Sequence, residues 1–135
     1  PQYLVNYLTF LRFSIKFKGA FLMSVYDIKS AENPDNALEK KHVPIIDAPD
    51  TVKKDEPFEV TVKMGEIDHP AEEGHFIQYV ELYAEYYQLV RANFTSEVRP
   101  EATFTIKLQE SCTLRAFEYC NLHGQWEAEK EITVE

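Results

Sequence analysis

Residues 58–64 read FEVTVKM, and every second side chain in this stretch is apolar. Successive side chains of a β-strand point to opposite faces of a sheet, so this alternation predicts a strand with one buried face. Residues 102–108, ATFTIKL, repeat the pattern, and shorter alternating runs cover residues 114–116 and 132–134. Prolines fall between these runs, where strand ends and turns tolerate them. The sequence therefore predicts an all-β fold.

Two other regions are less regular. The aromatic and aliphatic residues of residues 75–89 also fit a helical stripe, but their β-propensity favours one long strand or a bent pair of strands. Residues 30–40 are polar and contain the turn signal Asn-Pro-Asp-Asn, which predicts a loop. Together these segments predict a β-sandwich of about seven strands.

The first 22 residues differ in composition from the rest of the chain. They carry three basic residues and no acidic residue among many aromatic and aliphatic ones. Charges interrupt this run before about 18 apolar residues accumulate, which argues against a membrane span. Its basic residues follow the apolar run instead of preceding it, unlike those of a secretory signal. We expect residues 1–22 to be an extension and residues 23–135 to form the functional domain; an added edge strand or a contact between subunits is the alternative.

Charge and cysteine content narrow the possible functions. The net charge of -9 argues against a general affinity for nucleic acid or for anionic membranes, because both need clustered basic residues. We expect a cytoplasmic protein, in which Cys112 and Cys120 stay reduced. Cys112 is interpreted as a small buried apolar residue. Cys120 has neighbours that indicate a different role.

The chain has four histidines, and their positions indicate a metal site. A lone histidine is more often a hydrogen-bonded residue than a ligand, but here Cys120 and His123 are three residues apart and can chelate one metal from a single turn. His69 and His75 flank a short loop that contains a proline and a glycine, and His42 comes just before a predicted strand. All four histidines thus fall at strand ends or loops, where sites on a β scaffold are mounted.

The number and type of these donors favour iron over other metals. Structural zinc sites close at four tetrahedral ligands, so a fifth protein ligand argues against zinc. Blue copper sites use two histidines, a cysteine and a weak axial methionine, but Met23 and Met64 both precede Cys120. A five-coordinate iron with one open position is the better fit. An electron-transfer β-sandwich of the cupredoxin type remains the alternative.

Residues 39–46 (EKKHVPII), 69–77 (HPAEEGHFI) and 119–126 (YCNLHGQW) resemble the superoxide reductases, more narrowly the one-iron, neelaredoxin-like class. The resemblance runs from about Glu39 to the C-terminus and corresponds to the iron-binding domain of desulfoferrodoxin. It implies an immunoglobulin-like β-sandwich with a mononuclear non-haem Fe2+/Fe3+ centre. The implied activity is one-electron reduction of superoxide to hydrogen peroxide.

The resemblance also implies a role for each site residue. The four histidines would lie in the equatorial plane, and Cys120 would be the axial ligand opposite an open site. Lys41, just before His42, would attract superoxide and orient water for protonation of the peroxide. The family usually reads Glu-Lys-His at this point, whereas this chain has Lys40 in the position of the glutamate. Glu39 is the candidate acid that could reach oxidised iron if the loop bulges by one residue.

The same resemblance predicts the partners of the protein. An external one-electron donor, of the rubredoxin type in this family, would restore the ferrous state after each turnover. We also expect the protein to assemble as a homo-oligomer, either a dimer or a tetramer.

Overall fold

The fold consists of one short helix and eight strands within residues 27–135, the part of the chain that the computed structural model describes. The predicted extension at residues 1–22 lies outside these residues. The elements in chain order are α2 (Ala37–His42), β1 (Pro44–Asp47), β2 (Thr51–Val52), β3 (Phe58–Met64), β4 (Ile77–Ala84), β5 (Tyr87–Asn93), β6 (Glu101–Ile106), β7 (Cys112–Cys120) and β8 (Gly124–Val134). Within the described residues, no helix is long and apolar enough to cross a membrane.

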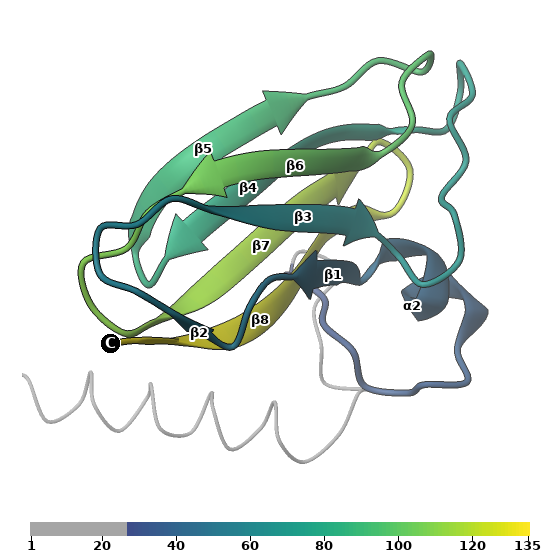
Figure 1. The fold of residues 1–135 in the computed structure, drawn as a ribbon. Coiled ribbons are helices and arrows are strands. Elements are labelled where there is room, and N and C mark those ends of the chain that lie inside the picture. The colour runs from purple at the N-terminus through teal and green to yellow at the C-terminus, as the bar shows by residue number, and fades with distance from the viewer. Residues whose placement is uncertain (1–26) are drawn as a thin grey trace, which may run out of the picture.

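The strands form two sheets that face each other (Figure 1). One sheet has three strands in the order β1-β3-β6, and both of its pairings are antiparallel. The other has five strands in the order β2-β8-β7-β4-β5, in which only the short β2 runs parallel to its neighbour. The predicted all-β sandwich is confirmed, with eight strands rather than about seven.

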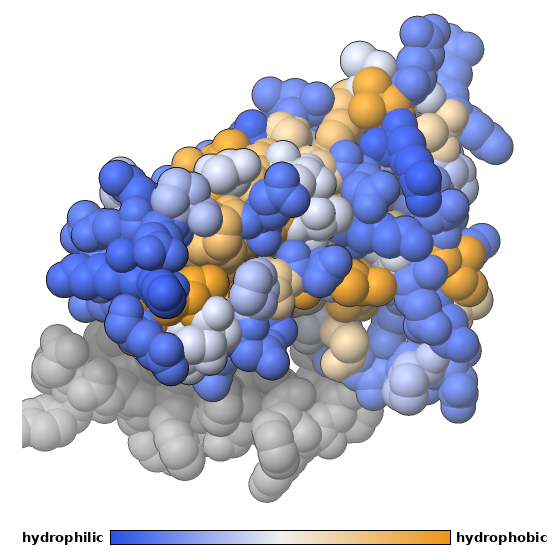
Figure 2. Space-filling model, in the orientation of Figure 1, coloured by the Kyte–Doolittle hydropathy of each residue, from blue (hydrophilic) through white to orange (hydrophobic). Residues whose placement is uncertain are grey.

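The core lies between the sheets and follows the predicted alternation. Val60, Val62 and Met64 of β3 are at most 1% exposed, and the residues between them are more exposed. The five-stranded sheet contributes fully buried side chains from three strands: Val80, Leu82, Leu114, Ala116 and Ile132. Burial of one side chain of this size contributes about 1.5–3 kcal/mol. The outer face of the three-stranded sheet carries mainly hydrophilic residues (Figure 2), as the alternation requires.

The alternation of apolar and polar residues did not settle the structure of residues 75–89 and 30–40. Residues 75–89 contain β4 and the start of β5, joined at Glu85 with a φ of 52°, which confirms a pair of strands rather than a helix. The expected loop at residues 30–40 is wrong for its last part, because α2 begins at Ala37. Asn36 caps this helix, and its Oδ1 accepts a hydrogen bond from the backbone N–H of Leu38 at 2.9 Å.

One end of the sandwich collects the segments that carry the predicted ligands. In Figure 1 this end is on the right, where α2, the β3–β4 connection and the β7–β8 turn come together. Gly65 follows β3 with a φ of +91°, and a Cβ atom there would lie 2.6 Å from the carbonyl oxygens of Lys40 and Lys41. Because only glycine fits, β3 can end directly against the last turn of α2. The backbone N–H of Ile67 also donates to the carbonyl of Lys40, at 3.0 Å.

Candidate metal centre

His42 and His69 are both buried, and a backbone carbonyl orients each ring. His42 is the last residue of α2, and its Nδ1 lies 2.7 Å from the carbonyl oxygen of Leu38, one turn earlier. His69 lies in the β3–β4 connection, and its Nδ1 lies 2.7 Å from the carbonyl oxygen of Pro70. A carbonyl oxygen can only accept, so Nδ1 of each ring carries the hydrogen and Nε2 presents a lone pair.

These two lone pairs face each other. The Nε2 atoms of His42 and His69 lie 3.1 Å apart, in a buried position. With both hydrogens committed to Nδ1, neither Nε2 can donate to the other, and a cation is needed to make the contact favourable. Two imidazole nitrogens bound at right angles to one ion, each at the distance of about 2.1 Å seen for zinc, would lie about 3 Å apart. The observed distance therefore fits two ligands of one metal ion.

The four imidazole rings form a closed four-membered arrangement. Neighbouring ring centroids lie 4.6–5.0 Å apart, at interplanar angles of 70–82°, in the order His42, His69, His75, His123 and back to His42. The centroids of His42 and His75 lie 6.2 Å apart. When four rings surround one central ion, opposite rings lie farther apart than neighbouring rings, as the distance between His42 and His75 shows. The Nε2 atom of His75 is buried and has no hydrogen-bond partner among the described residues, which leaves it free for a metal.

The thiol of Cys120 lies beside these rings. His42, His69, His75 and Cys120 each offer a ligand atom, and these atoms lie within 4.8 Å of one another. His123 lies next to this group, with its Nδ1 3.7 Å from the sulfur of Cys120. The structure therefore brings together all five residues that the sequence pointed to as ligands, with His123 at the margin of the cluster.

A tight turn holds Cys120 and His123 together. Cys120 ends β7 and pairs with Gly124, the first residue of β8. Gly124 has a φ of +79°, which glycine adopts without strain in a three-residue hairpin loop. Burial raises the pKa of the Cys120 thiol, and the backbone N–H groups of Leu122 and His123, which donate to the sulfur, only partly offset this effect.

Three of the four imidazoles, those of His42, His69 and His123, have lowered pKa values that favour the neutral, lone-pair-donating form. Burial lowers the pKa of His42 and of His69 to about 4, although the hydrogen bonds to the carbonyls of Leu38 and Pro70 act in the opposite direction. Lys41 adds a smaller effect that lowers the pKa of His69, so the positive charge of this lysine acts at the site. Burial also lowers the pKa of His123. Neutral imidazole is the form that binds metals.

Trp126 and Lys29 extend the site on the side of β8. The ring of Trp126 stacks on His42, with centroids 5.0 Å apart, and its Nε1 donates to the carbonyl of His123 at 3.2 Å. The ammonium group of Lys29 lies 5.3 Å from the centre of the Trp126 ring, and its charge contributes to the lowered pKa of His123. Lys29 was not identified from the sequence, because it lies 94 positions before His123.

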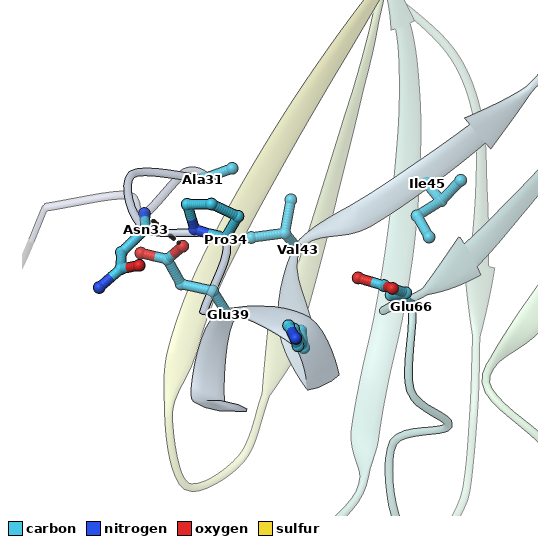
Figure 3. A pocket seen from close by; sticks show the side chains of 8 residues that line it. Ala31, Asn33, Pro34, Glu39, Val43, Ile45 and Glu66 are labelled. Carbon is cyan, nitrogen blue, oxygen red and sulfur yellow. Dashed lines mark hydrogen bonds between the residues drawn. The ribbon is translucent and has the colours of Figure 1, made fainter. Parts of the chain in front are cut away.

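The side chain of Glu39 bonds to the loop that precedes α2. Its Oε2 accepts hydrogen bonds from the backbone N–H groups of Glu32 and Asn33, at 3.1 and 2.8 Å. Figure 3 shows the carboxylate pointing towards Asn33, in a pocket that none of the predicted ligands lines. In this conformation the carboxylate is held by the loop before α2, and not among the imidazoles.

Two residues close to the cluster were missed from the sequence. Glu118 of β7 is fully buried, and neither carboxylate oxygen has a hydrogen-bond partner among the described residues. Burial raises its pKa to about 9, so this carboxyl group is neutral at pH 7. The alternation of Leu114 and Ala116 along β7 predicts an inward position for Glu118, and this was the available signal. Asn121, the second residue, bonds to a segment 45 residues away, which no local pattern reveals.

Comparisons with known proteins agree with this geometry. The family model for desulfoferrodoxin matches residues 34–129. A superoxide reductase from Pyrococcus furiosus is 34% identical over 116 residues, which cover 71% of this chain and 90% of the relative. A desulfoferrodoxin from Desulfarculus baarsii is 40% identical over 102 residues, which cover 73% of this chain and 70% of the relative. The solved structure of the superoxide reductase (neelaredoxin) from Ignicoccus hospitalis superposes with a TM-score of 0.70 at 43% identity, covering 80% of this chain and 95% of that one.

Proposed function

The chain belongs to the desulfoferrodoxin family of superoxide reductases, and from this we propose that it reduces superoxide to hydrogen peroxide at a single iron ion. The proposed ligands are His42, His69, His75, Cys120 and His123. The observation that carries the proposal is the 3.1 Å approach of two Nε2 lone pairs beside a buried thiol. Five donors of this type exceed the four of a closed structural zinc site and leave one position for substrate.

The metal and the protein would have separate tasks. When bound, iron supplies the electron that converts superoxide and two protons into hydrogen peroxide, and it changes from Fe2+ to Fe3+. His42 and His69 supply neutral nitrogen donors, already oriented by the carbonyls of Leu38 and Pro70. Cys120 supplies the one anionic donor once its thiol has lost a proton, and an anionic sulfur ligand favours electron donation by iron.

Positive charge near the site compensates for the acidic chain. A net charge of -9 repels an anionic substrate, so a local positive field is needed to bring superoxide to the metal. We assign this role to Lys41, which acts electrostatically on His69, with Lys29 as a further contributor beside His123. Lys41 would also orient the water that protonates the product. Glu39 would contribute only after releasing the loop that now binds its carboxylate.

Three further proposals concern the partners and location of the protein. A rubredoxin-like one-electron donor would restore Fe2+ after each turnover, and the face around Lys40 and Lys41 is one place where this acidic donor could dock. We propose a dimer or a tetramer in solution, and a cytoplasmic location.

The alternative function is electron transfer at a cupredoxin-type copper site. Such a site needs a weak axial methionine. Met64, the only methionine among the described residues, is 1% exposed and belongs to the core between the sheets. It is not part of the His and Cys cluster, which favours the iron site.

Metal analysis and spectroscopy of Cys120→Ser test the proposal. The purified protein should contain about one iron per chain and show a visible sulfur-to-Fe3+ band on oxidation, and its Fe2+ form should consume superoxide in pulse radiolysis. Cys120→Ser should lose the band. Cys112→Ser, at the other end of β7, is the matched control and should keep it. Full iron loading with an unchanged band in Cys120→Ser would refute the ligand assignment, and copper in place of iron would favour the alternative.

A further inference from the structure

Asn121 connects the two segments that carry the candidate ligands. It follows Cys120 directly, in the turn between β7 and β8. Its side-chain Oδ1 accepts a hydrogen bond from the backbone N–H of Phe76 at 2.9 Å, and its Nδ2 donates to the carbonyl of Gly74 at 3.0 Å. Its own backbone N–H donates to the carbonyl of Phe76 at 3.2 Å. The amide of Asn121 therefore bonds to the residue before His75 and to the residue after it.

The hydrogen bonds of Asn121 lie just beyond the last residue pair between β4 and β7. The pairing of β4 with β7 is irregular between Ile77 and Tyr79, and its last pair joins Ile77 to Cys120. The segment with His75 lies beyond this pair, so the ladder does not fix it to β7. Asn121 supplies the next connection, one residue beyond the last pair on each strand.

His75 needs such a connection more than its neighbours do. The rings of His42 and His69 are each oriented by a carbonyl that accepts from Nδ1. Within residues 27–135 the buried Nε2 atom of His75 has no hydrogen-bond partner, and the residue lies in a loop closed by a single bridge to Glu72. Its position in the cluster thus depends on the backbone on either side of it, which is where Asn121 binds.

We propose that Asn121 is the positioning residue that holds His75 against Cys120 and His123, and thereby sets the affinity and ligand geometry of the metal centre. This inference rests on the proposed metal site. The chemistry is specific, because only an amide of this length offers one acceptor to Phe76 and one donor to Gly74. An aspartate would keep the acceptor but place a second oxygen against the carbonyl of Gly74. A leucine of similar size would offer neither group.

Binding of Co2+ to the metal-free protein is the test, because its spectrum reports ligand number separately from activity. Residues that orient metal ligands typically contribute 10–100-fold to metal affinity, and we expect Asn121→Leu to weaken Co2+ binding by about this factor. Its Co2+ spectrum should match that of His75→Ala, with the sulfur-to-Co2+ band retained. Asn121→Asp should give an intermediate affinity. Gln78→Leu, which removes an exposed side-chain amide from β4, is the control and should leave affinity and spectrum unchanged.

A double variant separates a role through His75 from a general loss of structure. If Asn121 acts through His75, then His75→Ala combined with Asn121→Leu should bind Co2+ no more weakly than His75→Ala alone. Additive losses would overturn the proposal, as would a wild-type affinity and spectrum for Asn121→Leu. Should Asn121→Leu fail to fold, Asn121→Asp decides, and a wild-type spectrum for that variant overturns the inference. Absence of metal binding by the wild-type protein would instead refute the proposed function.

Discussion

The Nε2 atoms of His42 and His69 lie 3.1 Å apart, while Nδ1 of each ring donates to a backbone carbonyl. Burial keeps both imidazoles neutral well below pH 7, with pKa values of about 4. The same burial raises the pKa of the Cys120 thiol, so the sulfur holds its proton at neutral pH. The metal-free site is therefore prepared for a cation at its nitrogens and blocked by one proton at its sulfur.

Metal binding at pH 7 should release about one proton per ion, and this proton should come from Cys120. The expected result is an apparent affinity that rises about tenfold per pH unit between pH 7 and 8. Calorimetric titration with Co2+ in buffers of different ionisation enthalpy measures the number of protons. Cys120→Ser should release none at pH 7, and Cys112→Ser should behave like the wild type. Release of three or more protons would mean that the imidazoles are protonated in the free protein.

Gly65→Ala should damage both stability and the metal site. The new Cβ would lie 2.6 Å from backbone atoms of Lys40 and Lys41, and the φ of +91° disfavours any L side chain. We expect a loss of about 2–4 kcal/mol in unfolding free energy, and weaker metal binding because the end of α2 carries His42.

Two other glycines provide matched controls for Gly65→Ala. Gly124 has a φ of +79° but open space around its Cβ position, so Gly124→Ala should cost only the conformational part, about 1 kcal/mol. Gly74 has neither a positive φ nor a close neighbour, and Gly74→Ala should change stability by less than about 0.5 kcal/mol. Denaturant unfolding of the three variants measures how their losses in unfolding free energy rank. Equal losses for Gly65→Ala and Gly124→Ala would show that the contact with α2 does not matter.

The sequence predicted the parts of the fold that depend on local alternation. The run at residues 58–64 became β3, with its apolar side chains in the core. Helix α2 was missed because its six residues show no apolar stripe. It depends instead on the cap at Asn36 and on the close approach of Gly65, which is a tertiary contact.

The candidate site was predictable for a different reason. The spacing of Cys120 and His123 and the positions of the histidines at strand ends are visible in the chain itself. The residues that orient them are not, because Asn121 acts on a segment 45 positions away. Glu118 had a visible signal, since an acid at an inward position of β7 breaks the expected pattern. Only the structure gives its environment.

Glu118 should make the stability of the metal-free protein fall as the pH rises. Its pKa is about 9 in the folded protein and near 4.5 when unfolded, so between these values the folded state holds a proton that the unfolded state has released. This contribution is fully present below about pH 4.5 and is lost as the pH rises towards 9. Between pH 6.5 and 8 this contribution of Glu118 should fall by about 1 kcal/mol per pH unit. It is measured against a variant that lacks the carboxyl group, because the histidines of the unfolded chain also titrate near pH 6.5.

Glu118→Gln tests this assignment because its side chain has no proton to lose. Denaturant titration of the metal-free proteins should show the unfolding free energy of the wild type falling by about 1 kcal/mol per pH unit relative to that of Glu118→Gln, because the other titrating groups are common to both. Glu81→Gln, at a partly exposed carboxylate paired with Arg91, is the control and should keep the wild-type slope. Parallel slopes for the wild type and Glu118→Gln would mean that Glu118 is ionised in the folded protein.

Lys41 should accelerate the reaction with superoxide through its charge. Lys41→Gln should lower the second-order rate constant by about two- to tenfold at low ionic strength, because it removes a positive charge that acts at the metal centre. The rate of the wild-type protein should fall with added salt, and that of Lys41→Gln should fall less steeply. Lys29→Gln should give a smaller effect of the same kind.

Lys107→Gln removes the same unit charge at the opposite end of the sandwich and serves as the control. Pulse radiolysis of the Fe2+ forms measures all four rates; equal rates for Lys41→Gln and Lys107→Gln would show that net charge, and not a local field, governs the encounter.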